Sequence, residues 1–348
     1  MDRTELLGMD LEELCGVAES LGEKKFRGKQ LYHQLYRRQN LCLDTMTDVS
    51  RRFRTLLAER ATLYLPAIRQ VQCSEDGTVK YLLELDDGAR VESVYLPEEE
   101  RTTLCLSTQV GCAMHCAFCA TGAGGFVRDL SAGEILAQYL VISREHGLLN
   151  QSINIVFMGM GEPLLNVEAV LKAFAILTDP SGCALSRRKI TLSTCGIRSG
   201  MARLAQTAVR PKLAVSLNAS SAEQRRRLMP CERQYPLAEL LADCRRFPLR
   251  KGERITFEYI LIRDVNDQPA DARRLVRLLR EIRCKINLIA YNECPGLPFR
   301  SPTGDTILAF QNVLVEAGYS AFIRKSRGPD IQAACGQLTT RPAEVPGL

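Results

Sequence analysis

The sequence contains no tryptophan and few other aromatic residues, with 11 phenylalanines and 10 tyrosines in 348 positions. If the chain binds a nucleic acid, it should do so through phosphate contacts and shape, with little base stacking. No stretch is apolar for long enough to span a bilayer. The first residues, Met-Asp-Arg-Thr-Glu-Leu-Leu, are acidic where a secretory signal needs a basic flank and an apolar run. We therefore expect a cytoplasmic protein with no membrane partner.

The composition is that of a folded protein with many free thiols. A hydrophobic content of 46% allows one large core with a smaller appendage, or two ordinary domains. The 14 cysteines, in a chain this long without an export signal, are expected to be thiols, ligands or catalytic groups in a reducing compartment. The net charge is only +6, but basic residues cluster at 24–38, 187–189, 225–227, 245–251 and 324–327. A polyanion is a candidate partner, although each cluster alone fits a solvated surface equally well.

Three cysteines stand close together in one short segment, Gly-Cys-Ala-Met-His-Cys-Ala-Phe-Cys-Ala. Cys112, Cys116 and Cys119 are separated by three and then two residues, and thiolates at this spacing are soft ligands for zinc or for an iron-sulfur cluster. With no clear fourth ligand nearby, a 4Fe-4S cluster would keep one iron open to a small molecule, which indicates chemistry. The alternative is a structural zinc site with His115 or a distant cysteine as the fourth ligand.

The first hundred residues predict two small units. Asp10 and Glu13 form a capping box for a helix that Gly22 ends, and a second apolar helix face would contain Phe26, Leu31 and Leu35 between basic residues. We expect residues 1–62 to be a helical accessory domain that contacts RNA. From 67 to 96 the apolar period becomes two, with Asp-Gly turns, which predicts a small antiparallel meander within residues 63–101.

Residues 102–338 alternate short apolar strands with helical segments, which is typical of a parallel α/β domain. The predicted strands are 104–110, 153–158, 189–193, 212–217, 255–262 and 285–290, and helices are expected at 132–144, 167–177 and 268–282. Polar turns follow the strands, and in α/β barrels the carboxyl ends of strands form the active site. We therefore expect a partial (β/α)6 barrel with an N-terminal helical domain and a small antiparallel β extension, followed by a tail at 339–348.

The polar turns contain candidate ligand-binding residues. Gly161 permits close backbone approach, and the adjacent Glu162 would place a carboxylate against an ammonium group. Ser193, Ser216 and Asn218 offer hydroxyl and amide groups for carboxylate or ribose oxygens. The alternatives are an ordinary strand-to-helix turn for Gly-Glu-Pro and helix capping for the other three.

The spacing Cys-x3-Cys-x2-Cys, with an aromatic residue before the last cysteine, resembles that of the radical-SAM enzymes. Nearly the whole chain resembles the RlmN/Cfr family, radical-SAM methyltransferases that modify adenosine in RNA. The matching segments are Leu-Cys-Leu-Ser-Thr-Gln-Val-Gly-Cys from Leu104, Cys-Ala-Thr-Gly from Cys119, Met-Gly-Met-Gly-Glu-Pro-Leu-Leu-Asn from Met158, Ile-Thr-Leu-Ser-Thr from Ile190, Leu-Ala-Val-Ser-Leu from Leu213, Lys-Ile-Asn-Leu-Ile from Lys285 and Ala-Ala-Cys-Gly-Gln-Leu from Ala333. The resemblance implies one 4Fe-4S cluster and two molecules of S-adenosylmethionine (SAM) per turnover.

The resemblance also implies residue roles. The cluster ligands would be Cys112, Cys116 and Cys119, and the SAM contacts would be Gly161, Glu162, Ser193, Ser216, Leu217, Asn218 and Asn292. Cys335 would take a methyl group from one SAM, and a radical from the second SAM would then activate that methyl for addition to the adenine ring. Cys105 would attack Cys335 to release the RNA and leave a disulfide, and Glu92 would remove the ring proton. Taken alone, the two cysteines also fit buried core thiols, and Glu92 fits a solvated charge.

Several alternatives stay open at the level of sequence. The segment 324–331 resembles the carbon 2 branch of the family, which acts on 23S rRNA and tRNA with an electron donor such as a flavodoxin system; the other branch acts at carbon 8. Many relatives have His where Asn218 stands, and Asn cannot titrate near neutrality. No function is assigned to Cys195, Cys231 or Cys294. No obligate protein partner is evident for the methyltransferase. Other hypotheses are a radical-SAM activase that abstracts hydrogen from a partner protein and a zinc-stabilised RNA-binding module without catalysis.

Overall fold

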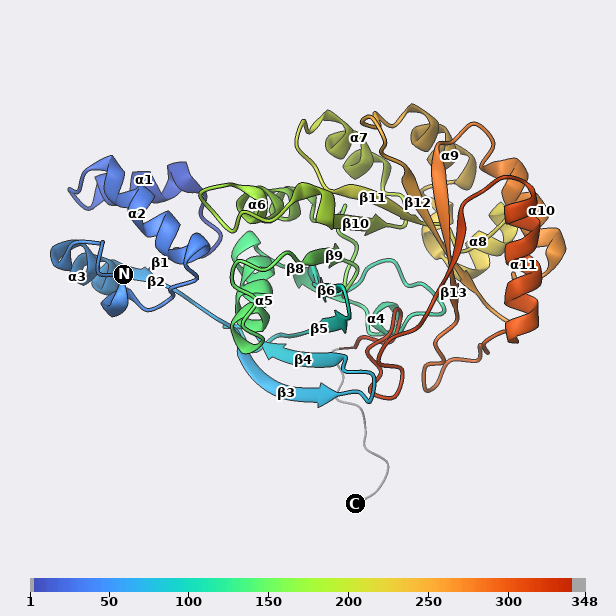
Figure 1. Ribbon diagram of the computed structural model, residues 1–348, viewed down its shortest axis with the longest axis horizontal. Helices are drawn as coiled ribbons and strands as arrows, with labels where there is room; N and C mark the ends of the chain where they lie inside the picture. The colour runs from blue at the N-terminus through green and yellow to red at the C-terminus, as the bar shows by residue number, and fades with distance from the viewer. Residues whose placement is uncertain (1–2, 340–348) are drawn as a thin grey trace, which may run out of the picture.

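The N-terminal segment forms a small helical unit at one end of the computed structural model, which describes residues 3–339 (Figure 1). Its elements are β1 (Thr4–Glu5), α1 (Leu11–Ser20), α2 (Lys25–Tyr32), α3 (Arg51–Arg60) and β2 (Ala61–Thr62). The predicted capping box is present, because Asp10 accepts the amide of Glu13 and Glu13 accepts the amide of Asp10. Positions 340–348 of the predicted tail lie outside the described residues.

One predicted helix face is wrong at its first residue. Leu31 and Leu35 are fully buried, but Phe26 is 46% exposed and lies under the Arg27 guanidinium, 4.7 Å from the ring centroid. Phe26 belongs to the first turn of α2, outside the part of the helix that packs on α1 through Gly28. A Cβ at Gly28 would lie 2.4 Å from the Cα of Cys15, so this close contact fixes which side of α2 faces inward.

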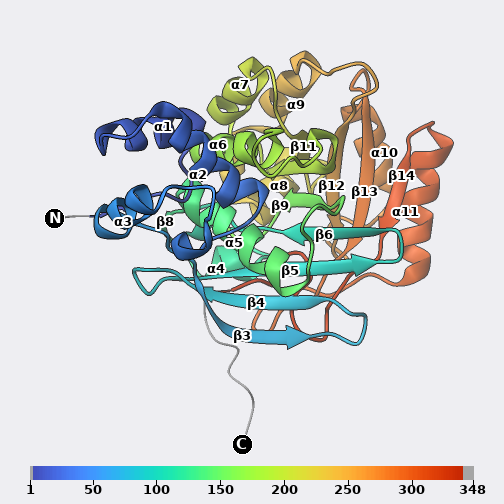
Figure 2. The ribbon, with the colours of Figure 1, turned by 60° about the vertical axis from the view of Figure 1, so that its left-hand side comes forward.

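The antiparallel meander is continuous with the barrel sheet. Over residues 3–339 the structure contains one ten-stranded sheet, ordered β14-β13-β12-β11-β10-β9-β6-β5-β4-β3. The antiparallel strands are β3 (Ala67–Cys73), β4 (Val79–Glu84) and β5 (Arg90–Glu98), and β5 pairs with β6 (Arg101–Cys105). The meander therefore extends the sheet beyond its β6 edge (Figure 2).

Within the ten-stranded sheet the strands from β6 to β14 are parallel, and the helices cover its outer side, which confirms the predicted fold class (Figure 1). The strands are β9 (Asn154–Phe157), β10 (Ile190–Thr194), β11 (Lys212–Ser216), β12 (Ile255–Leu261), β13 (Cys284–Ala290) and β14 (Ala321–Arg324). The helices are α5 (Ala132–Glu145), α6 (Val167–Thr178), α7 (Arg198–Gln206), α8 (Ala222–Leu228), α9 (Leu237–Arg246), α10 (Pro269–Leu278) and α11 (Gly304–Glu316). The first and last strands of the order, β14 and β3, are not paired with each other, so the described barrel is open.

Two strand predictions differ from the structure. The expected strand at 104–110 ends at Cys105, and Gln109–Gly111 forms β7, which pairs with β8 (Phe126–Asp129) in a separate hairpin. The break lies at Ser107, whose hydroxyl donates to the carbonyl of Glu92. The second difference is β14, an edge strand of four residues to which the sequence analysis assigned no strand, and on which Phe322 and Ile323 are both exposed.

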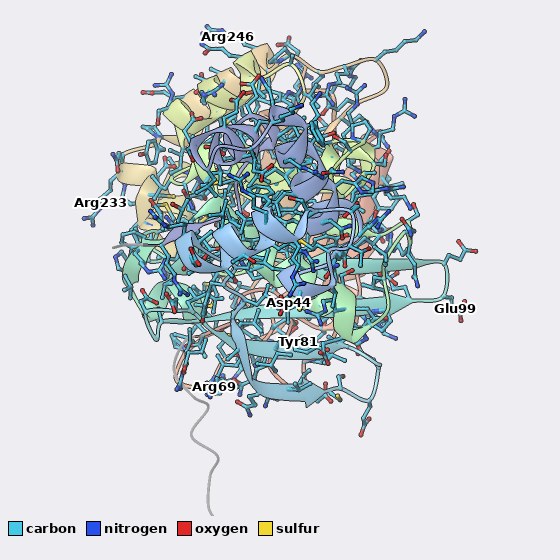
Figure 3. The ribbon with its side chains drawn as sticks, turned by 90° about the vertical axis from the view of Figure 1, so that its left-hand side faces the viewer. Asp44, Arg69, Tyr81, Glu99, Arg233 and Arg246 are labelled. Atoms are coloured by element: carbon cyan, nitrogen blue, oxygen red, sulfur yellow. The ribbon has the colours of Figure 1, made fainter. Side chains whose placement is uncertain are left out.

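The layers place the barrel core between the sheet and its helices, where Phe257, Tyr259 and Phe310 are fully buried. Figure 3 shows the molecule from its N-terminal side, with Arg246 at the end of α9 and Arg69 on β3 at opposite ends of that face. None of the helices within residues 3–339 is both long and apolar enough to cross a membrane.

Candidate active site

The three clustered cysteines lie on a loop between β7 and α4 (Ala120–Ala123), above the carboxyl ends of the strands. The amide of Cys112 donates to the carbonyl of Gly125 at 2.8 Å. Gly111 has φ +76, and a Cβ there would lie 2.0 Å from the same carbonyl oxygen, so the position requires glycine. At the other end of the loop, the amide of Ala117 donates to the carbonyl of Leu228 at 2.9 Å. This loop, residues 112–119, is called the cluster loop below, and these contacts hold it from two sides.

The thiols of this loop form a donor set that fits a metal cluster. Burial and the neighbouring Cys119 raise the pKa of Cys116 well above its usual range, and burial raises the pKa of Cys112 to about 12. The amide of Met114 donates to the sulfur of Cys112 and partly opposes that rise. Three cysteine sulfurs are soft donors of the kind that iron-sulfur clusters use, and a positively charged iron site would favour the thiolate forms of Cys112 and Cys116 that burial disfavours.

A single metal ion fits the loop less well. In the part of the chain that the structure describes, no three His, Cys, Asp or Glu side chains converge as ligands of one ion. Zinc would need thiolates about 2.3 Å from a common centre. His115, the proposed fourth ligand, is exposed and has its Nδ1 3.2 Å from the carbonyl oxygen of Gly122. The zinc alternative therefore gains no support from the geometry.

Glu162 is buried beneath this loop with both carboxylate oxygens engaged. One oxygen accepts the amide of Leu164 at 3.0 Å and the other accepts the amide of Cys195 at 2.8 Å. Burial raises the pKa of Glu162 in spite of these donors. Gly161 has φ +104, and a Cβ there would lie 2.6 Å from the Cβ of Gln109. The glycine is thus required for packing against Gln109, whatever its role toward a ligand.

The remaining predicted SAM contacts lie on neighbouring strand ends. The hydroxyl oxygens of Ser193 on β10 and Ser216 on β11 are 3.2 Å apart. Leu217 is fully buried, and its amide donates to the carbonyl of Glu258 at 2.9 Å. The side-chain oxygen of Asn218 accepts the amide of Ile260 at 3.0 Å, and its backbone has φ +54. The roles of these residues stay predictions.

A cavity of about 370 Å³ joins several of the predicted catalytic residues. The predicted site residues that line it are Cys105, Cys119, Asn292 and Cys335. Gly161, Glu162, Ser193, Ser216, Leu217 and Asn218 are not among its lining residues in the described structure. The cavity thus collects the two proposed catalytic cysteines and one cluster ligand from segments that are distant in sequence.

Cys335 lies on a loop that follows β14 and is exposed within this cavity. The side-chain amide of Asn292 donates to the carbonyl of Cys335 at 3.1 Å, and the hydroxyl of Thr121 donates to the carbonyl of Leu338 at 2.6 Å. Desolvation, followed by the nearby charge of Glu258, raises the pKa of Cys335 to about 11. At neutral pH the sulfur is therefore mostly a thiol, and a base or a bound cation must favour its thiolate.

Cys105 and Glu92 approach the same loop from the sheet. Burial and then the charge of Cys335 raise the pKa of Cys105. Glu92, on β5, is 6% exposed, and its carboxylate accepts the amide of Thr339 at 2.9 Å and lies 3.1 Å from the ammonium of Lys80. Burial raises the pKa of Glu92, and attraction to Lys80 offsets only part of that rise. Glu92 lies next to the Cys335 loop but is not a lining residue of the cavity as described.

The sequence analysis missed four buried charged residues around the site. Glu258 interrupts the apolar strand β12, lines the cavity and accepts the amide of Asn287 at 2.9 Å. A charged residue inside an apolar strand is a signal that could have identified it. Arg225 and Glu232 form a fully buried ion pair at 2.5 Å beside the cluster loop. The sequence around Lys80 did not indicate its burial, because apolar Val79, Tyr81 and Leu83 alternate along this strand and Lys80 falls on the opposite face, where a solvated residue is expected.

Two of the unassigned thiols also lie near the cluster loop. The sulfur of Cys195 is 3.2 Å from that of Met114, and its thiol donates to Cys231. That contact and the nearby guanidinium of Arg225 lower the pKa of Cys231. The sulfur of Cys294 lies 3.4 Å from the carbonyl oxygen of Asn292. Nothing in the structure assigns these three a function.

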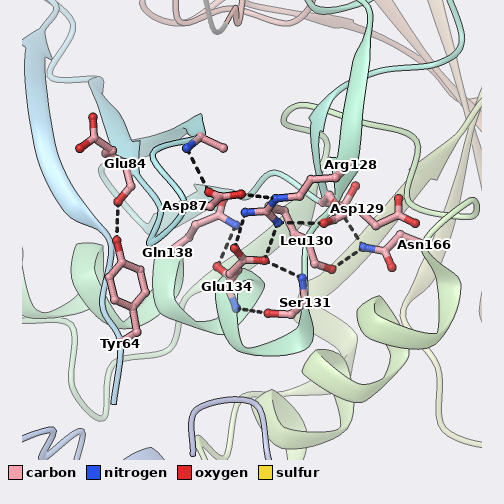
Figure 4. A network of polar contacts seen from close by, with 12 residues as sticks. Tyr64, Glu84, Asp87, Arg128, Asp129, Leu130, Ser131, Glu134, Gln138 and Asn166 are labelled. Atoms are coloured by element: carbon pink, nitrogen blue, oxygen red, sulfur yellow. Dashed lines mark hydrogen bonds and ion pairs between the residues drawn. The ribbon is translucent and has the colours of Figure 1, made fainter. Parts of the chain in front are cut away.

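A polar network holds the β7–β8 hairpin in place behind the cluster loop (Figure 4). Arg128 on β8 pairs with Asp87 of the meander and with Glu134 of α5, both at 2.7 Å. The side-chain amide of Asn166 donates to the carbonyl of Leu130 at 2.7 Å. The hairpin whose two strands flank the three clustered cysteines is thus tied to the meander, to α5 and to the turn before α6.

Comparisons with known proteins agree with this geometry. A family model described as the Radical SAM superfamily matches residues 106–276, and one described as the ribosomal RNA large subunit methyltransferase N-terminal domain matches residues 4–63. A protein of Desulfotalea psychrophila named dual-specificity RNA methyltransferase RlmN is 47% identical and covers 97% of this chain and 96% of its own. A protein of the same name from Syntrophus aciditrophicus is 46% identical and covers 99% of each chain. The crystal structure of a radical SAM methyltransferase from Sphaerobacter thermophilus superposes with a TM-score of 0.92 and 41% identity, over 97% of this chain and 100% of that one.

Proposed function

Because the chain belongs to the RlmN family of radical-SAM RNA methyltransferases, we propose that it methylates carbon 2 of adenosine in 23S rRNA and in tRNA. The relatives named above are dual-specificity RNA methyltransferases, which supports two classes of RNA substrate. The observation that carries the proposal is the single cavity lined by Cys105, Cys119 and Cys335. A cluster ligand, a methyl carrier and a second thiol then act in one enclosed space.

The family uses a 4Fe-4S cluster and two molecules of SAM, which supply a methyl group and the abstraction of one hydrogen atom. We propose that Cys112, Cys116 and Cys119 hold the cluster. Gly161, Glu162, Ser193, Ser216, Leu217, Asn218 and Asn292 are proposed as SAM contacts. The three thiols of the loop support the first assignment, and the position of Asn292 on the cavity wall supports its part in the second.

Three side chains of this protein would carry out the RNA chemistry. Cys335 accepts the methyl group on its sulfur and later carries the carbon bonded to the base. Glu92 removes the proton from the ring carbon. Cys105 then attacks the sulfur of Cys335, so that an S–S bond forms as the S–C bond to the base-linked carbon breaks. The released carbon takes up a proton and becomes the methyl group of the base. The cavity that Cys105 shares with Cys335 and the burial of Glu92 beside the same loop support these roles.

The reaction also requires an electron donor, for which we propose a flavodoxin system. The basic residues of the N-terminal helices support RNA binding by residues 1–62. Lys24 is the N-cap residue of α2, and Arg27 and Lys29 lie within that helix. The boundaries at 62, 101 and 338 are proposed as the limits of the accessory domain, the meander and the catalytic core.

The proposal is tested with anaerobically reconstituted protein, SAM, a reductant and transcripts of a 23S rRNA fragment and of tRNA. Mass spectrometry of the digested RNA should find 2-methyladenosine with the wild-type protein and none with Cys335→Ala. A product methylated at carbon 8 would move the enzyme to the other branch of the family. Methylation by Cys335→Ala would show that this sulfur is not the methyl carrier.

A further inference from the structure

Lys80 is a buried cation that the catalytic scheme does not use. It lies on β4 and is only 5% exposed. Its ammonium is 3.1 Å from the carboxylate of Glu92 and donates to the backbone carbonyl of Gln332 at 3.2 Å. Burying an ammonium group costs folding free energy unless the group is paired and hydrogen-bonded. The contacts with Glu92 and Gln332 supply that compensation for Lys80.

Lys80 and Glu92 together contact both ends of the loop that carries Cys335. Lys80 binds the carbonyl of Gln332, on the N-terminal side of Cys335, and Glu92 accepts the amide of Thr339, on its C-terminal side. The Lys80–Glu92 ion pair joins these two contacts. One pair of side chains on adjacent antiparallel strands thus defines where the loop begins and ends.

Attachment of the loop to the meander does not depend on Lys80. The guanidinium of Arg327 pairs with Asp76 at 3.0 Å, and the hydroxyl of Ser74 donates to Asp330 at 2.6 Å. These contacts fix the segment before the loop through the β3–β4 turn. The contribution of Lys80 lies closer to the sulfur, where it connects the loop to the carboxylate proposed as proton acceptor.

We propose that Lys80 is a positioning residue for RNA methylation. It holds the Glu92 carboxylate at a fixed position relative to the Cys335 loop, so that the proton acceptor and the methyl carrier both reach the same adenine base. This inference rests on the proposed function. Loss of the ammonium would also leave the Glu92 carboxylate without its counter-charge, and a carboxylate in an apolar site ionises at a higher pH.

The test compares Lys80→Met, Lys80→Arg and Lys172→Met. Lys172 forms an ion pair with Glu13 on the surface, so its variant controls for loss of a Lys–Glu pair outside the site. The rate of RNA methylation is measured from pH 6 to 9, together with the thermal midpoint and the methyl content of Cys335. We expect Lys80→Met to lower the rate about tenfold or more and to move the pH of half-maximal rate upward. Lys80→Arg, which keeps the charge, should retain the wild-type pH of half-maximal rate, and Lys172→Met should match the wild type throughout.

A Lys80→Met protein with the rate and pH profile of the wild type would overturn the inference. So would a Lys80→Arg protein whose pH profile shifts as far as that of Lys80→Met. A measurement on the wild-type protein covers the case in which Lys80→Met does not fold. The amide of Thr339, which donates to Glu92, should be protected from hydrogen exchange, and exchange there at the rate of an unstructured amide would refute the double contact. If the wild type methylates no RNA while Thr339 is protected, the proposed function fails and the loop contact stands.

Discussion

Cys105, at the end of β6, and Cys335, in the loop after β14, line the same cavity, and the charge of Cys335 raises the pKa of Cys105 beyond the effect of burial. Burial is the larger of the two causes, and Cys335 is itself mostly a thiol at neutral pH, so its charge opposes ionisation of Cys105 only as the pH rises. Both sulfurs therefore rest as thiols in the cavity. The attack of Cys105 on Cys335 requires a local base or cation that stabilises the Cys105 thiolate.

Replacement of Cys105 should trap the enzyme on its substrate. We expect Cys105→Ala to form an RNA–protein adduct that persists, since the thiol that releases Cys335 is gone. Denaturing gels with labelled RNA measure the adduct. Cys73→Ala, at an exposed cysteine on β3, is the matched control and should release RNA as the wild type does. Rapid turnover by Cys105→Ala would contradict the resolving role.

The reactivity of Cys335 should follow its ionisation. With its pKa raised to about 11, the thiolate fraction and the rate of alkylation by iodoacetamide should increase with pH across the neutral range. Glu258→Gln should speed alkylation at a given pH, because the Glu258 charge contributes to the raised pKa. Peptide mass spectrometry reads the modification at Cys335 alone. Glu99→Gln, in the β5–β6 turn, is the control, and an equal effect there would exclude a local charge interaction.

Glu258 should also make stability depend on pH. Burial raises its pKa in the folded state, so the folded protein binds this proton more tightly than the unfolded chain does. The stabilisation from that proton is fully present below the unfolded pKa and is lost as pH rises through the folded pKa. The urea midpoint of Glu258→Gln, relative to the wild type, should therefore increase from pH 4 to pH 7. A constant difference between the two proteins would show that Glu258 ionises normally.

Gly159 is predicted to tolerate no side chain. A Cβ at this position would lie 2.7 Å from the hydroxyl of Ser107 and 2.8 Å from the backbone of Leu106. We expect Gly159→Ala to lower the free energy of unfolding by about 1–3 kcal/mol, the usual cost of overpacking. Gly16, in α1, has open space around it, so Gly16→Ala should raise that free energy by about 0.5–1 kcal/mol. Urea unfolding distinguishes the two, and a neutral Gly159→Ala would mean that the strand ends separate easily.

The buried ion pair beside the cluster loop should be costly to break. Arg225 is fully buried against Glu232, and Arg225→Met leaves that carboxylate without a counter-charge. The expected loss is about 3–5 kcal/mol in the free energy of unfolding. Arg203 pairs with Glu168 on the surface, and Arg203→Met should leave the urea midpoint unchanged within error. Similar midpoints for the two variants would indicate that water reaches the Arg225 site.

The sequence predicted what local patterns determine. The cysteine spacing indicated the cluster loop, the capping residues at Asp10 and Glu13 indicated the start of α1, and the apolar runs from Ile153 to Ala290 indicated the parallel strands of the barrel. Each of these features depends on residues within a few positions of one another, where periodicity and spacing are informative.

Contacts between distant segments could not be read in the same way. Lys80 bonds to Gln332 and Glu92 to Thr339, and neither strand contains a local mark of these partners. The four-residue edge strand β14 is defined by its pairing with β13, and Phe26 was misplaced because the contact of Gly28 with α1 sets the orientation of α2. In each case packing against a remote element outweighed the local pattern.

The described sheet does not close on itself, since β14 and β3 form no pair. The segment after β14 bridges that seam with side chains and turns, through Arg327 and Asp76 on one side and Asn292 on the other. In a barrel closed by backbone hydrogen bonds, the two edges could separate only if the hydrogen bonds between two paired strands were broken. The seam of the described structure is instead fastened by side-chain contacts, so loss of these contacts would separate its two edges without unpairing any strand.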